Sequence, residues 1–303
     1  MTLRKTAVSL AVMLVLWSGV SGTAVAGDPC DLCASGCGNK RPKRLLTWAG
    51  QKPTYVSDYD EEDTLNTDRP DFTESSATVG LGRVQLEAGY TYVYDEDGTN
   101  YTKENSFGEP LFRIGMFAEW FELRIAWNYL EEDTLTGGVF NTDTGAVDMY
   151  LGAKLGLTEQ HGVLPETSLI PQMRVPTGAN AFSADEVLPG LNFIYAWQLT
   201  DRLSMAGSTQ ANRTVDDLGQ YYTEVAQSWV FGLSLTDKLG TYAEWFGIFP
   251  DGALDPSVGA QHSFNGGFAY LVNNNLQLDA RAGLGLNARA PDYFLGTGFS
   301  IRF

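Results

Sequence analysis

The chain has 303 residues and a formal net charge of −17, from 20 Lys and Arg against 37 Asp and Glu. This acidity argues against nucleic acid as a partner, because phosphate recognition needs clustered cationic side chains. The 33 glycines and 12% aromatic residues favour short strands and tight turns, while 2 histidines and 3 cysteines provide little for catalytic residues, a metal site or a cofactor, so we expect none of these.

The first residues have the organisation of a secretory signal peptide. Arg4 and Lys5 precede an apolar run over residues 7–17, and residues 24–26 are small. The run is about eleven residues long, which is too short to cross a hydrocarbon core ~30 Å thick, and no later segment approaches the roughly 18 apolar residues of a spanning helix. We therefore expect residues 1–26 to be removed on export, and a helical inner-membrane transporter is excluded.

Residues 27–78 predict an irregular periplasmic segment. Two of Cys30, Cys33 and Cys37 could form a local disulfide in an oxidising compartment and leave the third free, whereas a zinc site would need a fourth ligand that is missing nearby. An acidic run over residues 58–63 then indicates a solvated linker. The folded domain is expected to begin near residue 79 and to extend to residue 303.

From residue 84 onward, apolar and polar residues alternate with a period of two. Between Val84 and Tyr94, and again between Leu276 and Leu286, one side of the chain is apolar and the other is polar or glycine. Successive side chains of a strand point to opposite faces, so each strand has one apolar and one polar face. Twelve strands are expected, near residues 82–94, 108–118, 121–130, 146–158, 166–176, 188–200, 202–213, 223–236, 240–249, 258–272, 275–287 and 293–303.

The links between these strands alternate in length. Short turns, as at residues 200–202 and 273–275, alternate with longer acidic links such as 95–105 and 131–145. Together with an even strand count, this asymmetry is typical of a transmembrane antiparallel β-barrel in outer-membrane lipid, with both termini in the periplasm. The alternative is a soluble β-sandwich or lipocalin-like barrel. The small and amide residues of the polar faces suit a lumen better than they suit a charged surface in water, so we predict an all-β membrane barrel.

The polar faces place charged side chains in the predicted lumen. The lumen-lining candidates are Glu87, Arg113, Glu122, Arg124, Asp148, Lys154, Arg174, Glu244, Asp279, Arg281 and Arg302. Such mixed signs can pair across neighbouring strands, which favours a structural role; alternatively, the arginines form a basic path for anions. A barrel of about twelve strands lies between the filled barrels of about eight and the open ones of about sixteen, so both a narrow passage and a plugged lumen are compatible with the sequence.

The last expected strand ends at an aromatic residue. Tyr293, Phe299 and Phe303 share its apolar face. A terminal phenylalanine on an alternating strand is similar to the signal by which bacterial outer-membrane proteins are recognised. We therefore expect Phe303 to serve as an insertion signal, and the barrel-insertion machinery to be a partner.

Two stretches resemble a known family. Residues 67–74 read TDRPDFTE and contain Asp68, Arg69, Pro70, Asp71 and Phe72, and residues 277–303 form a similar closing stretch. Both resemble the outer-membrane transporters named for the meta-pathway of phenol degradation, over roughly residues 64–303. The resemblance implies a channel, in some members associated with the catabolism of aromatic compounds. Residues 67–74 are interpreted either as a plug, with Arg69 and Asp71 pairing with lumen charges, or as an ordinary entry turn.

The function predicted is passive diffusion of small solutes, such as aromatic or other small organic compounds, through the lumen. Two other classes stay open. One is a structural or adhesive barrel without conductance. The other is a hydrolase at the outer rim, in which His262 would pair with Asp251 or Asp255, although a lone rim histidine is usually a polar loop residue. The solute and the oligomeric state are left open by the sequence.

Overall fold

The computed structural model describes residues 40–56 and 64–303. The expected signal peptide, the three cysteines and the acidic run over residues 58–63 lie outside the described residues. Within the described part of the chain, no helix is long and apolar enough to cross a membrane.

The described residues fold mainly into β-strands, which form two sheets. The small sheet pairs β1 (Arg41–Pro42) with β2 (Tyr55–Val56). The large sheet contains β3 (Val84–Asp97), β4 (Asn100–Gly115), β5 (Phe121–Ala126), β6 (Tyr129–Thr136), β7 (Val139–Ala146), β8 (Met149–Thr158), β9 (Glu166–Val175), β10 (Leu188–Gln198), β11 (Leu203–Val215), β12 (Tyr221–Ser234), β13 (Leu239–Asp251), β14 (Gln261–Asn273), β15 (Leu276–Gly285) and β16 (Tyr293–Arg302).

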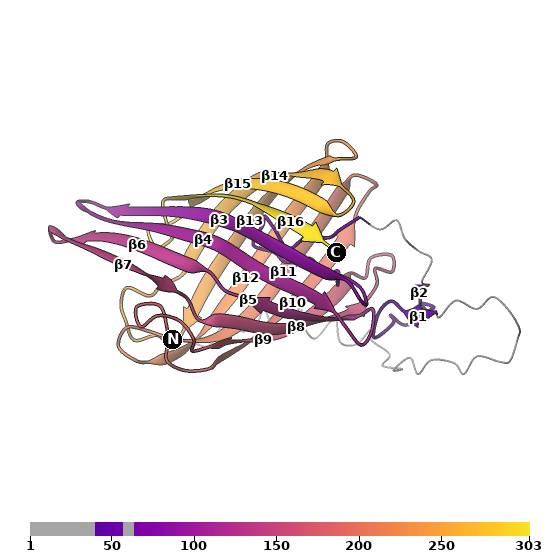
Figure 1. Cartoon of the computed structure of the whole chain (residues 1–303), viewed down its shortest axis with the longest axis horizontal. Coiled ribbons are helices and arrows are strands. Elements are labelled where there is room, and N and C mark those ends of the chain that lie inside the picture. Colours follow the sequence, from indigo (N-terminus) through magenta and orange to yellow (C-terminus); the bar gives the residue numbers. More distant parts are fainter. Residues whose placement is uncertain (1–39, 57–63) are drawn as a thin grey trace, which may run out of the picture.

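The large sheet closes into a barrel because β3 pairs with both β16 and β4 (Figure 1). β6 continues the line of β5 along β4 after a gap of two residues, and β8 likewise follows β7. When each interrupted pair is counted as one strand, the barrel has twelve antiparallel strands, which confirms the predicted all-β barrel and its strand count.

Alternating burial along the strands shows which face points outward. On β15 and β16, Leu278 and Phe299 are 48% and 38% exposed, whereas Asp279 and Ser300 are 5% and 0% exposed. A soluble β-protein buries its apolar face, so this inverted pattern is that of a barrel surrounded by lipid.

A photoactivated apolar reagent dissolved in the bilayer is accordingly expected to label Leu278 and Phe299 and to spare Asp279 and Ser300. The first two side chains lie on the outer wall, where they would contact lipid, while the other two face the interior. Peptide mapping by mass spectrometry of the reconstituted protein measures the pattern. Labelling of Asp279 and Ser300 in preference to the outward pair would contradict the membrane orientation.

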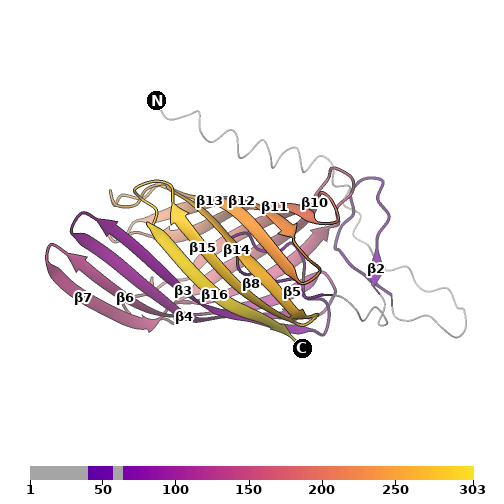
Figure 2. The same cartoon turned by 90° about the horizontal axis from the view of Figure 1, so that it is seen from above.

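The two ends of the barrel differ, as Figures 1 and 2 show. At one end, which we call the short-turn end, tight connections such as residues 199–202 and 235–238 join the strands. At the other, which we call the hairpin end, the β3–β4 and β6–β7 hairpins project beyond the rest of the wall.

These two hairpins correct the prediction that residues 95–105 and 131–145 are loops. Both stretches are mostly strand, and their turns have only two residues, with positive φ at Gly98 in one and at Gly137 and Gly138 in the other. Glycine adopts such φ values without a steric cost. Acidic residues suggested loops, but strands that project beyond the barrel wall can carry charge on both faces.

Candidate functional site

Residues 64–83, which we call the plug, fold inside the barrel ahead of β3. At one end of the plug, the amide of Leu65 donates to the carbonyl of Asn274 at the short-turn end of the barrel (2.9 Å). At the other end of the plug, the amide of Gly82 donates to the carbonyl of Gly115, also at the short-turn end (2.9 Å). A Cβ atom at Gly115 would overlap the carbonyl oxygen of Gly80, so this close approach requires glycine. The plug therefore enters and leaves the barrel at one end.

Asp68 joins the plug to a cationic cluster on the wall, formed by Arg113 of β4, Arg124 of β5 and Lys154 of β8. Its carboxylate lies 2.6 Å from Nη1 of Arg124, 2.9 Å from Nζ of Lys154 and 3.4 Å from Nε of Arg113. Burial alone would raise the pKa of Asp68, but the three cations, Arg113 first, hold it well below its ordinary value. Asp68 is therefore an anion with three buried cationic partners.

The wall cannot neutralise this cluster with the strand carboxylates beside it. Arg113 and Arg124 are direct cross-strand neighbours of like charge. Glu122 lies 2.8 Å from Arg113 and 2.9 Å from Arg124, and Glu87 lies 2.9 Å from Arg113. These two wall carboxylates face three cations, and the plug supplies two further carboxylates, Asp68 and Glu74, the second of which lies 3.0 Å from Arg124.

Glu244 of β13 holds the plug by a different chemistry, as an acceptor for its backbone. One carboxylate oxygen accepts from the amide and the hydroxyl of Thr73, both at 2.7 Å, and the other accepts from the amide of Phe72 at 2.7 Å and from Asn265 at 2.8 Å. The Phe72 ring stacks on Phe246 with centroids 4.4 Å apart. The plug is thus fastened to two separate regions of the wall.

Arg69 and Pro70 make a third set of contacts. Arg69 lies 2.9 Å from Glu109 and 3.3 Å from Asp279, while Arg281 donates to the carbonyl of Pro70 at 2.9 Å. The Arg69 guanidinium fills the space left by the paired glycines at positions 89 and 298, where a Cβ atom would collide with it. Residues 67–74 are therefore a plug rather than an ordinary entry turn.

Asp71 also lies inside the plug, but it has an anionic neighbour. Burial, and then the charge of Glu244, raise the pKa of Asp71 well above its ordinary value. The expected pairing of Arg69 with lumen charges is present, whereas Asp71 lies beside a second carboxyl group.

Eight of the eleven lumen-lining candidates contact the plug or its anchoring charges, and three lie elsewhere. Asp148 occupies the gap between β7 and β8, where its carboxylate accepts from the amides of Thr177, Gly178 and Ala184 and so caps a loop. Arg174 is exposed near the end of β9, and Arg302 donates to Asn275 at the short-turn rim. Alternation does not distinguish Arg174 and Arg302 from the other candidates because it identifies a face of a strand and says nothing of depth along the barrel, whereas Asp148 lies where the strand is interrupted.

Phe303 follows β16 at the short-turn end. Its amide donates to the carbonyl of Val84 at 2.8 Å, and its side chain is 73% exposed. Its role as an insertion signal stays a prediction.

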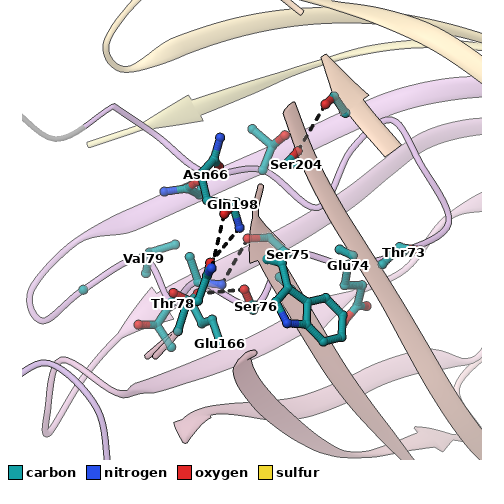
Figure 3. Close-up of a pocket in the computed structure, with 18 of the residues that line it drawn as sticks. Asn66, Thr73, Glu74, Ser75, Ser76, Thr78, Val79, Glu166, Gln198 and Ser204 are labelled. Carbon is teal, nitrogen blue, oxygen red and sulfur yellow. Dashed lines mark hydrogen bonds between the residues drawn. The ribbon is translucent and has the colours of Figure 1, made fainter. Parts of the chain in front are cut away.

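A chamber of about 1000 Å³ lies beside the plug. Figure 3 shows the plug residues Thr73, Glu74, Ser75, Ser76 and Thr78 together with Gln198 and Ser204 of the wall, all of which line the chamber. The hydroxyl of Ser76 donates to Glu166 at 2.7 Å. Its wall is formed mainly by β10 to β13, and residues 41–56 line it at the short-turn end. Within the described residues, no group of three or more His, Cys, Asp or Glu side chains could hold a metal ion.

The sequence does not predict the roles of two components of this site. Asp68 is identified as part of the family motif but not as the partner of the cationic cluster, although three cations beside two carboxylates on β3, β4, β5 and β8 indicate a missing anion. Residues 40–56 were expected to be irregular, yet they form the β1–β2 pair and line the chamber. The apolar Trp48 beyond the basic residues 40–44 was the available signal.

Comparison with solved structures places the fold among outer-membrane barrels. An outer membrane channel from Pseudomonas putida F1 shares 12% identity, with 82% of this chain and 100% of that chain covered and a TM-score of 0.56. The translocator domain of the autotransporter NalP from Neisseria meningitidis (14% identity, 77% and 90% covered) and the transport unit of the autotransporter AIDA-I from Escherichia coli (11%, 73% and 89%) both have a TM-score of 0.50. These likenesses concern the fold.

Comparison by sequence identifies the family. No curated protein matches the chain significantly. The family described as "Putative MetA-pathway of phenol degradation" matches residues 67–303, which run from the plug motif to the end of the barrel. Because this match spans most of the chain, the protein belongs to that family.

Proposed function

We propose that the protein is an outer-membrane channel through which small organic solutes, including small aromatic compounds, pass by passive diffusion. In this proposal the hairpin end faces the exterior and the short-turn end faces the periplasm, as in other outer-membrane barrels with short periplasmic turns. The observation that carries the proposal is the chamber inside the barrel, since its volume of about 1000 Å³ is that of a site for a small molecule.

The plug sets the size limit of this passage. At the inner end of the chamber, the Thr73 hydroxyl hydrogen-bonds Ser228 at 2.6 Å and Glu244 at 2.7 Å, which closes the plug onto β12 and β13. A solute must therefore pass beside this contact or open it. Small molecules fit this requirement, and the phenol-degradation description of the family favours aromatic acids or phenols among them.

Conductance and solute uptake test the proposal together. Purified protein in planar bilayers is expected to give discrete conductance steps, and proteoliposomes are expected to swell in benzoate but not in a large oligosaccharide, because the plug narrows the lumen. A barrel with a purely structural or adhesive role would give neither conductance nor swelling, and that result would overturn the channel function.

Replacing His262 with alanine is expected to leave conductance and swelling unchanged. The His262 ring packs against Trp245 and Phe249, with centroids 5.8 and 5.4 Å apart, while Asp255 accepts hydrogen bonds from Ser257. The same variant tests the rim hydrolase. A hydrolytic activity in the native protein that disappears in His262→Ala would contradict the absence of an enzyme here.

A further inference from the structure

Residues 40–56, which we call the N-terminal hairpin, lie outside the family match and are firmly attached to the short-turn end. The amides of Leu45 and Leu46 donate to the carbonyls of Gly156 and Leu157 at 3.0 and 2.8 Å, which extends the backbone pairing beside the end of β8. Trp48 is 2% exposed, and its indole donates to Pro165 at 2.9 Å. The hairpin is therefore a fixed part of the mouth, held by backbone bonds and a buried aromatic side chain.

Each basic residue of the hairpin that lines the chamber lies against a carboxylate of the barrel. Arg41 lies 2.9 Å from Glu119, and Arg44 lies 2.7 Å from Glu166. Lys43, whose side chain is about half exposed, lies 3.7 Å from Glu159. The three carboxylates belong to the connections and strand starts at the short-turn rim, so the hairpin neutralises the acidic side chains of this part of the rim.

The charges that line the chamber depend on the hairpin. Among the described residues that line it, the cations are Arg41, Lys43, Arg44 and Arg83, and the acids are Asp71, Glu74, Glu119 and Glu166. Three of the four cations come from the hairpin. Without them, one arginine would face the four acidic side chains. Whether Asp71 is protonated or not, the hairpin changes the charge balance by three.

We propose that the N-terminal hairpin sets the charge selectivity of the short-turn mouth and allows small organic anions, such as aromatic carboxylates, to pass. The inference rests on the proposed channel function. Fixed charges in a narrow, low-dielectric passage raise the local concentration of ions of opposite sign and exclude those of like sign. A rim of unpaired carboxylates would repel anionic solutes, and the three hairpin cations remove that barrier.

The test compares ion selectivity in planar bilayers, using the full chain with Arg41→Gln, Lys43→Gln and Arg44→Gln combined. In a gradient of potassium benzoate, the reversal potential of this variant is expected to shift toward the equilibrium potential of potassium. This shift corresponds to a several-fold fall in the permeability of benzoate relative to that of potassium. The matched control replaces Arg202 and Lys238 with glutamine, since these cations lie in other short turns and do not line the chamber. The control is expected to retain native selectivity.

A compensated variant separates the effect of charge from loss of attachment. Adding Glu119→Gln, Glu159→Gln and Glu166→Gln to the triple variant restores the charge balance and is expected to restore native selectivity. Conducting triple-variant channels with unchanged selectivity would overturn the inference, as would a compensated variant that fails to recover. Absence of conductance in the native protein would instead overturn the channel function.

Discussion

Replacing Asp68 with asparagine is expected to detach the plug from β4, β5 and β8 and to raise single-channel conductance. Asparagine keeps the shape of the side chain but removes the charge, so Lys154 loses the carboxylate that lies 2.9 Å from its Nζ, while Arg113 and Arg124 keep Glu87, Glu122 and Glu74 as partners. Removing one partner of a buried ion pair costs about 3–5 kcal/mol. Bilayer recordings measure the conductance, and limited proteolysis measures the exposure of residues 64–83.

The contribution of Asp68 to docking of the plug also depends on pH. Because the pKa of Asp68 is lowered in the folded protein, by cations that outweigh the effect of burial, its contribution to plug docking is present above its unfolded pKa. The contribution disappears as the pH falls through the folded value. Native channels are therefore expected to hold the plug at neutral pH, and strong acid is expected to reproduce the Asp68→Asn phenotype.

Asp71→Asn is the matched control, since it makes the same chemical change three residues away in the same plug. Burial and the neighbouring Glu244 raise the pKa of Asp71, so an amide resembles the protonated carboxyl group that this environment favours. Conductance close to native is expected. An increase equal to that of Asp68→Asn would mean that any change within the plug loosens it, which would contradict the specific role of Asp68.

Replacing Glu244 with glutamine is expected to weaken the second attachment of the plug and to increase the frequency of channel opening. Its carboxylate accepts from the amides of Phe72 and Thr73 and from the Thr73 hydroxyl, and a side-chain amide offers one acceptor oxygen in place of two. Hydrogen bonds to charged groups contribute about 1.5–3 kcal/mol each. A docking loss of about 3 kcal/mol is therefore expected.

Glu224→Gln provides the comparison for Glu244, because Glu224 lies on the adjacent strand β12 nearer the hairpin end. The conductance trace of the Glu224→Gln variant is expected to match that of the native protein. Equal opening frequencies in Glu244→Gln and in the native channel would show that backbone capture by Glu244 does not hold the plug.

The plug motif shows how much of the candidate site the sequence predicts. TDRPDFTE was recognisable as a motif, and a plug was one of two interpretations, because conformation within residues 64–83 follows no repeating pattern. The structure resolves the choice through contacts between distant residues: Asp68 with Lys154, and Thr73 with Glu244. Such contacts depend on which strands face each other across the lumen, and no local property of the sequence encodes that arrangement.

The interruption between β7 and β8 shows a second limit of prediction from alternation. Alternation assigned Asp148 to the lumen, but β7 ends at Ala146 and β8 begins at Met149, so Asp148 lies where the strand period is interrupted. Its carboxylate caps the backbone of residues 177–184 instead.

The sequence by itself determined the barrel: a period of two assigns each side chain to one of two faces, and the apolar face, as at Leu278 and Phe299, points outward. That rule is local, since consecutive residues of any strand obey it. Only the tertiary structure decided what fills the lumen and lines its mouth. The contacts of Asp68 and Glu244 with the plug, and of Arg41 with Glu119, join residues far apart in the chain, and closure of the barrel is what brings them within hydrogen-bonding distance.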